Sequence, residues 1–72
     1  MISYNDIATR EDRTFLSNCR RRLGKRKFES LIPAVKTAFR DAYNNEPNIN
    51  KKENVAKRAA NMIYSKAMTD KI

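Results

Sequence analysis

The feature that most constrains the fold is an apolar pattern between positions 31 and 43. Its members recur at intervals of three and four, which places them on one side of a helix. They are Leu31, Ile32, Val35, Ala38, Phe39, Ala42 and Tyr43. Ser30 is a suitable N-cap, and Pro33 would then lie in the first turn, where its missing N–H costs nothing. The pattern predicts a core helix over about 30–45.

A second helix is predicted over about 9–23. Thr9-x-x-Asp12 resembles a capping box, and Ser3-x-x-Asp6 resembles another, so we place the helix start at Thr9. The apolar residues fall on one face, and they are Ala8, Phe15, Leu16, Cys19 and Leu23. Gly24, the only glycine in the chain, follows Leu23 directly and predicts a left-handed helix stop. The residues before Thr9 are expected to be a short irregular segment.

A third helix is predicted over about 51–68, with a broad face of mostly small side chains. This face consists of Val55, Ala56, Ala59, Ala60, Ile63, Tyr64 and Ala67. Alanines allow two helices to approach closely, so this helix should pack tightly against the core helix. Short connections favour antiparallel neighbours. We therefore expect an all-α three-helix bundle that forms one domain over residues 1–72.

Length and composition limit how such a chain can be stabilised. With 72 residues, one small core barely offsets the entropy of the chain, so good packing, dimerisation or a bound partner must contribute. A lone cysteine and the absence of histidine exclude an internal disulfide and a zinc site. No apolar run could span a membrane, and the N-terminus lacks a signal-peptide pattern. We expect a cytoplasmic protein without cofactors, metals or membrane partners.

Enzymatic signatures are also absent, since no histidine can act as a general base and one glycine cannot make a phosphate-binding loop. Cys19 is the one ambiguous candidate. The arginines beside it could lower its pKa and make a reactive thiolate. However, it lies at the centre of an apolar helix face, so we predict a small core residue and a non-enzymatic protein.

The positive charge is concentrated in one place. The net charge of +8 divides into −1 for residues 1–18, +6 for 19–28, −1 for 29–50 and +4 for 51–72. We call residues 20–27 the basic segment. Its cations are Arg20, Arg21, Arg22, Lys25, Arg26 and Lys27.

A basic helix end followed by a solubilising turn would explain part of this density. An acidic protein surface would match it too. Nucleic-acid phosphates are the preferred interpretation, because binding them relieves the repulsion between the cations and releases counterions. Arg21, Lys25, Arg26 and Lys27 are the cations with no evident structural purpose.

The third predicted helix offers a second surface opposite its alanine face. Asn54, Arg58, Asn61 and Ser65 recur at helical spacing, with Lys51 and Lys57 beside them. Asparagine and arginine can read bases, and lysine can anchor phosphates, although solvated helix faces commonly carry the same residues. The connection over 44–50 is longer than the turn of a helix-turn-helix motif and contains no glycine.

Most aromatic residues fall on predicted core faces, which leaves only Tyr4 and Phe28 as candidates for base stacking. Contact with a duplex backbone is therefore preferred. We predict a small basic nucleic-acid-binding protein, with a homodimer as one route to added stability and affinity. The alternative is a protein-interaction module that docks a basic face on an acidic partner, as an adaptor or inhibitor. A phage or accessory gene would be a fitting source for such a chain.

Overall fold

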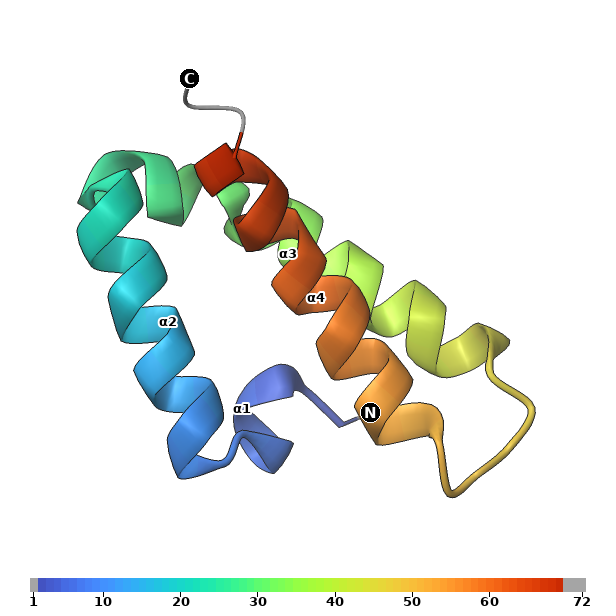
Figure 1. The fold of residues 1–72 in the computed structure, drawn as a ribbon. Coiled ribbons are helices and arrows are strands. Elements are labelled where there is room, and N and C mark those ends of the chain that lie inside the picture. Colours follow the sequence, from blue (N-terminus) through green and yellow to red (C-terminus); the bar gives the residue numbers. More distant parts are fainter. Residues whose placement is uncertain (1, 70–72) are drawn as a thin grey trace.

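The computed structural model describes residues 2–69, which form an all-α globule (Figure 1). Its helices are α1 (Tyr4–Ile7), α2 (Arg10–Leu23), α3 (Lys25–Asn45) and α4 (Lys52–Thr69). No strand occurs in the described part of the chain. The predicted three-helix architecture is confirmed. The expected irregular N-terminal segment is wrong in detail, because it contains the short helix α1.

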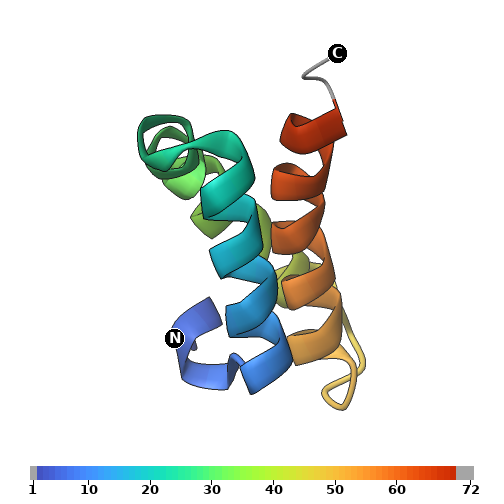
Figure 2. The same ribbon diagram turned by 60° about the vertical axis from the view of Figure 1, so that its left-hand side comes forward.

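The three long helices alternate in direction. Figures 1 and 2 show α2 and α4 running from the same end of the molecule towards the other, with α3 running back between them. The α3–α4 pair makes the most extensive contact. Ala56 and Ala60 of α4 are fully buried, which confirms that small side chains bring these two helices close together.

The hydrophobic core is small and draws on all three long helices. Its buried members are Cys19, Leu23, Val35, Phe39, Ala56, Ala60 and Tyr64. Cys19 has no exposed surface, so the prediction that it is a core residue is confirmed. Burial raises the pKa of its thiol, and the nearby Arg22 counteracts this only in part. The thiol therefore stays protonated at neutral pH.

Helix α1 is held in place by the capping box that Ser3-x-x-Asp6 indicated, and by contacts with α3 and α4 that the sequence pattern did not predict. The Ser3 N–H donates to Asp6 Oδ2 at 2.9 Å and fixes the start of the helix. The Tyr4 ring packs on Phe39 with a centroid separation of 6.0 Å, and its hydroxyl donates to Asn61 Oδ1 at 2.7 Å. These contacts tie the segment to α3 and α4, which explains why it is ordered.

The junction between α2 and α3 is a single residue, Gly24. The predicted helix stop is confirmed, but its geometry differs from the expected left-handed turn. Gly24 has φ 88° and ψ 151°, an extended conformation that is nearly exclusive to glycine. Its N–H donates to Arg20 O, and its own carbonyl accepts from the Phe28 N–H, each at 2.9 Å. Gly24 therefore ends one helix and begins the next without a linker.

The predicted start of the core helix at about residue 30 is wrong, since α3 begins at Lys25. Pro33 accordingly lies inside the helix rather than in its first turn. Ser30 is not the N-cap: its hydroxyl donates to Lys27 O at 2.6 Å. The Phe28 ring stacks on Tyr64 with centroids 4.7 Å apart. This contact stabilises helix formation before Ser30. Pro33 lacks the N–H of a normal helix residue, but it lies on the exposed side of α3, where water can replace the missing hydrogen bond.

Candidate nucleic-acid interface

The basic segment occupies the corner where α2 meets α3 (Figure 1). Arg20, Arg21 and Arg22 form the last turn of α2, and Lys25, Arg26 and Lys27 form the first turn of α3. All six residues are exposed. Lys25, Arg26 and Lys27, which lie between two predicted helices in the sequence, therefore belong to α3 and not to a connecting turn. The two halves lie on two helices whose ends meet at Gly24.

One half of the basic segment is stabilised by the dipole of its helix, and the other half is destabilised by it. The arginines suit the negative C-terminal end of α2, whereas Lys25, Arg26 and Lys27 oppose the positive N-terminal end of α3. No acidic residue occupies the first turn of α3. Gly24, the N-cap residue, has no side chain that could accept hydrogen bonds from the first N–H groups of α3. The first turn of α3 therefore concentrates positive charge that a bound anion would stabilise.

Within residues 2–69, none of Arg20, Arg21, Lys25, Arg26 and Lys27 forms an ion pair with a carboxylate. The two ion pairs within residues 2–69 are Arg40–Asp41 and Lys57–Asp12, and both lie outside the basic segment. Lys66, in the last turn of α4, adds a further cation at the same end of the molecule (Figures 1 and 2). The sequence pattern alone did not indicate Lys66 as part of this surface. The predicted antiparallel packing of the second and third long helices could have indicated Lys66, because it brings the end of α4 beside the start of α3.

The polar stripe of α4 forms one wall of a shallow groove of about 520 Å³ against α2. The predicted stripe residues Asn54, Arg58, Asn61 and Ser65 all line it, together with Lys57. Asp12 and Phe15 come from α2. Asn54 and Arg58 are exposed, whereas Lys57 and Asn61 are only partly exposed. The structure thus brings the predicted stripe together, but it divides these residues into accessible and engaged side chains.

Lys57 has an intramolecular partner. Its ammonium donates to Asp12 Oδ2 at 2.9 Å, and the two side chains are only 18% and 17% exposed. The same oxygen accepts from the backbone N–H of Thr9 at 2.9 Å, which completes the predicted capping box of α2. The Thr9 N–H and the Lys57 ammonium hold the pKa of the Asp12 carboxyl below its ordinary value. This cluster joins the start of α2 to α4.

Acid is expected to destabilise the protein through Asp12. Because its pKa is lowered in the folded state, its contribution is complete above its ordinary value of about 3.9 and is lost as the pH falls through the lowered value. Asp12→Asn should cost about 1–3 kcal/mol of unfolding free energy at neutral pH and should flatten the loss of stability below about pH 4. Urea unfolding at several pH values checks this.

Asp6→Asn is the matched control, because Asp6 occupies the corresponding position of the first capping box and has no lysine partner among the described residues. Its pKa is also lowered, mainly by the Ser3 backbone N–H, so some acid sensitivity should remain in Asp12→Asn. Equal stability of wild type and Asp12→Asn at neutral pH would contradict the role given to the Asp12–Lys57 pair.

The remaining predicted site residues have other neighbours. Asn61 accepts the hydrogen bond from Tyr4, so its carbonyl oxygen is engaged with α1. Lys51 directly precedes α4, at the end of this helix that is opposite the basic segment. Along the helix axis it lies about 22 Å from Lys66. The neighbouring Lys52 donates to Tyr43 O at 2.9 Å and lies over the Tyr43 ring. The predicted binding residues therefore do not form one continuous surface.

The aromatic side chains are used internally. All six are buried or partly buried, and these are Tyr4, Phe15, Phe28, Phe39, Tyr43 and Tyr64. Phe28 is stacked on Tyr64, and Tyr4 is packed on Phe39. The two aromatic residues that the sequence left as candidates for base stacking thus have ring partners within the fold.

Comparisons with family models, with curated proteins and with solved structures found no match to this chain. Among the helices of the described residues, none combines the length and the apolar character that crossing a bilayer requires.

Proposed function

We propose that this chain is a small, non-enzymatic, cytoplasmic nucleic-acid-binding protein that contacts the phosphate backbone of a duplex through its basic segment. One observation carries the proposal: six exposed cations gather at the joint of two helices, where one helix ends and the next begins. Lys66 extends this surface. Like charges at this density repel one another. When these cations bind and neutralise nucleic-acid phosphates, the counterions condensed on the nucleic acid are released, which favours binding.

The start of α3 favours phosphate as the bound anion. Lys25, Arg26 and Lys27 lie at the positive end of the helix dipole, and their backbone N–H groups precede the first helical hydrogen bond, from Phe28 to Gly24. Phosphates bind readily at such helix ends. A phosphate at this corner would meet side-chain cations and backbone donors together, which explains why cations occupy a helix end that disfavours them.

The internal use of the aromatic side chains supports a duplex rather than a single strand. Binding to a single strand usually relies on exposed rings that stack on bases, and the fold offers none among the six aromatic residues. Asn54 and Arg58 are exposed members of the α4 stripe that can contact bases or phosphates, and we include them as a secondary contact. Lys57 and Asn61 are left out because the fold already engages them.

Purification with and without nuclease tests the proposed partner class. We expect the chain to retain nucleic acid at low salt, with a raised ratio of absorbance at 260 to 280 nm, and to lose it after nuclease treatment in high salt. The alternative is a protein-interaction module that docks the basic segment on an acidic protein. Retention of a stoichiometric protein after complete nuclease digestion, without bound nucleic acid before it, would support that alternative and contradict the proposal.

A further inference from the structure

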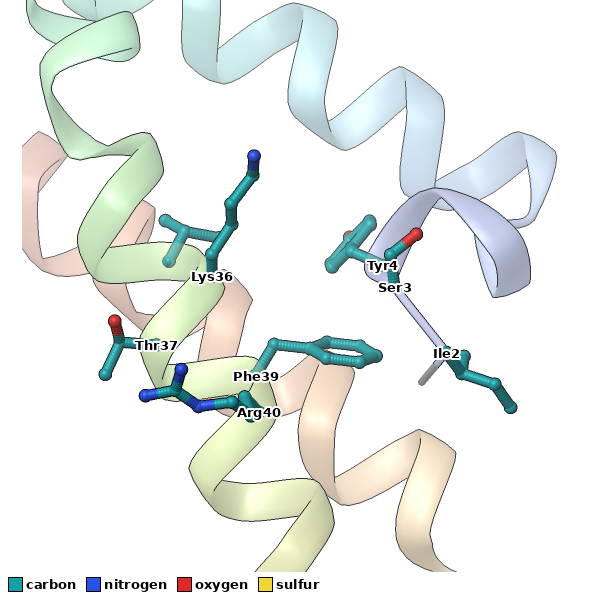
Figure 3. Close-up of a pocket in the computed structure, with 8 residues that line it drawn as sticks. Ile2, Ser3, Tyr4, Lys36, Thr37, Phe39 and Arg40 are labelled. Carbon is teal, nitrogen blue, oxygen red and sulfur yellow. The ribbon is translucent and has the colours of Figure 1, made fainter.

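An apolar groove separates α1 from α3 (Figure 3), and none of its lining residues belongs to the basic segment. A hollow of about 340 Å³ has Tyr4, Val35 and Phe39 among its apolar lining. A second hollow of about 200 Å³ shares Tyr4 and Val35 with the first and reaches along α3 to Ile32 and Phe28, with Leu16 of α2 and Tyr64 of α4 also contributing to its lining. From Phe28 to Arg40 the axis of α3 rises about 18 Å, so the groove is elongated.

The charges along this groove have one sign. Lys36 lines both hollows and Arg40 lines the larger one, while no carboxylate belongs to either lining among the described residues. Figure 3 shows Lys36 extending from α3 towards the space between α3 and the N-terminal segment. Among the described residues Arg40 pairs with Asp41 at 3.6 Å, an exposed pairing that contributes little. The groove therefore combines an apolar floor with Lys36, which extends towards it, and with Arg40 at its edge, whose guanidinium points away from Ile2 and Tyr4 in Figure 3; a negatively charged ligand would complement both cations.

We propose that this groove binds an acidic amphipathic helix of a partner protein. Apolar side chains at positions i, i+4 and i+7 of that helix enter the hollows, and its carboxylates face Lys36 and Arg40. A helix of about 12 residues matches the length of the groove. A second copy of this chain fits poorly, because each copy carries a net charge of +8 and the two would repel. A phosphate backbone fits poorly too, since it leaves the apolar floor unfilled.

A defined peptide tests the proposal without knowledge of the natural partner. The probe is a fluorescein-labelled helical peptide of about 14 residues, with leucine at i, i+4 and i+7 and glutamate at most other positions. We expect it to bind the full chain in fluorescence anisotropy. Versions with the leucines changed to alanine, or the glutamates to lysine, should bind at least about tenfold more weakly. Equal binding of all three peptides would overturn the proposal.

Variants of the protein locate the contact. Lys36→Ala with Arg40→Ala should weaken peptide binding by about tenfold. The matched control, Arg10→Ala with Arg13→Ala, removes the same charge from exposed positions of α2 and should change affinity by less than about twofold. Equal losses in the two double variants would show a response to net charge alone and would overturn the proposal. Circular dichroism checks that each variant remains folded.

Chemical-shift mapping separates this proposal from nucleic-acid binding. The peptide should shift the amide signals of Tyr4, Val35 and Phe39, and should do so equally when the basic segment carries alanines that remove duplex binding. Shifts confined to residues 20–27 would overturn the groove assignment. Shifts at the groove on raising the protein concentration alone would identify a second copy as its occupant, which also overturns it. Duplex binding can fail while the peptide still binds, so the two proposals are tested independently.

Discussion

Removing four cations of the basic segment should lower the affinity for duplex DNA by about three orders of magnitude at about 0.1 M salt. The four are Arg21, Lys25, Arg26 and Lys27, each changed to alanine. Each phosphate contact contributes about 0.9 to the slope of the logarithm of affinity against the logarithm of salt concentration. At about 0.1 M salt each contact is therefore worth a little under tenfold in affinity, and four contacts together give an effect of this size. All four side chains are exposed, and the variant should remain folded. Anisotropy of a labelled duplex measures the change.

A second quadruple alanine variant controls for net charge. It removes the same number of cations from exposed positions elsewhere, at Arg10, Arg13, Lys36 and Arg40. We expect its affinity to fall by less than about tenfold, through the weaker long-range field alone. If the two variants lost affinity equally, binding would depend on total charge rather than on the corner between α2 and α3, and the proposed site would be wrong.

Phe39→Ala is expected to unfold the chain at room temperature. The side chain is only 3% exposed, and its ring lies 6.0 Å from that of Tyr4 and 6.3 Å from that of Tyr43. Truncating such a residue costs about 3–5 kcal/mol, which matches or exceeds the stability of a core this small. Far-ultraviolet circular dichroism should show a large loss of helix, and urea unfolding should lose its cooperative transition.

Two further variants keep this prediction quantitative. Phe39→Leu should remain folded and lose about 1–2 kcal/mol, because it fills part of the same space. Ile49→Ala removes an apolar side chain that is 78% exposed and should change stability by less than about 0.5 kcal/mol. Similar losses for Phe39→Leu and Ile49→Ala would contradict the assignment of Phe39 to the core.

The helices and the core could be predicted because their signals are local. The spacing of Val35 and Phe39, the buried alanines of α4 and the capping box at Thr9 each depend on residues within a few turns of the same helix. The start of α3 could not be predicted in this way. Pro33 and Ser30 carry a local signature of a helix start, and the contact of Phe28 with Tyr64, distant in sequence, overrides it.

The candidate site was partly predictable for a similar reason. Arg20 to Lys27 are adjacent in sequence, so they lie together in almost any fold. The contribution of Lys66 and the engagement of Lys57 and Asn61 depend on how α4 packs against its neighbours. Asp12 is a capping residue in the sequence and an ion-pair partner only in three dimensions. Helical spacing places Lys57 and Asn61 on one stripe, but it does not reveal which residues form hydrogen bonds with them.

The salt dependence of duplex binding tests the central claim most directly. The logarithm of the affinity of the wild-type chain, plotted against the logarithm of salt concentration, should fall with a slope of about −4 to −5, as expected for four to six phosphate contacts. The basic-segment quadruple variant should have a slope shallower by about 3.6, which leaves it between zero and about −2. A wild-type slope near zero, or the same slope in both proteins, would contradict the account.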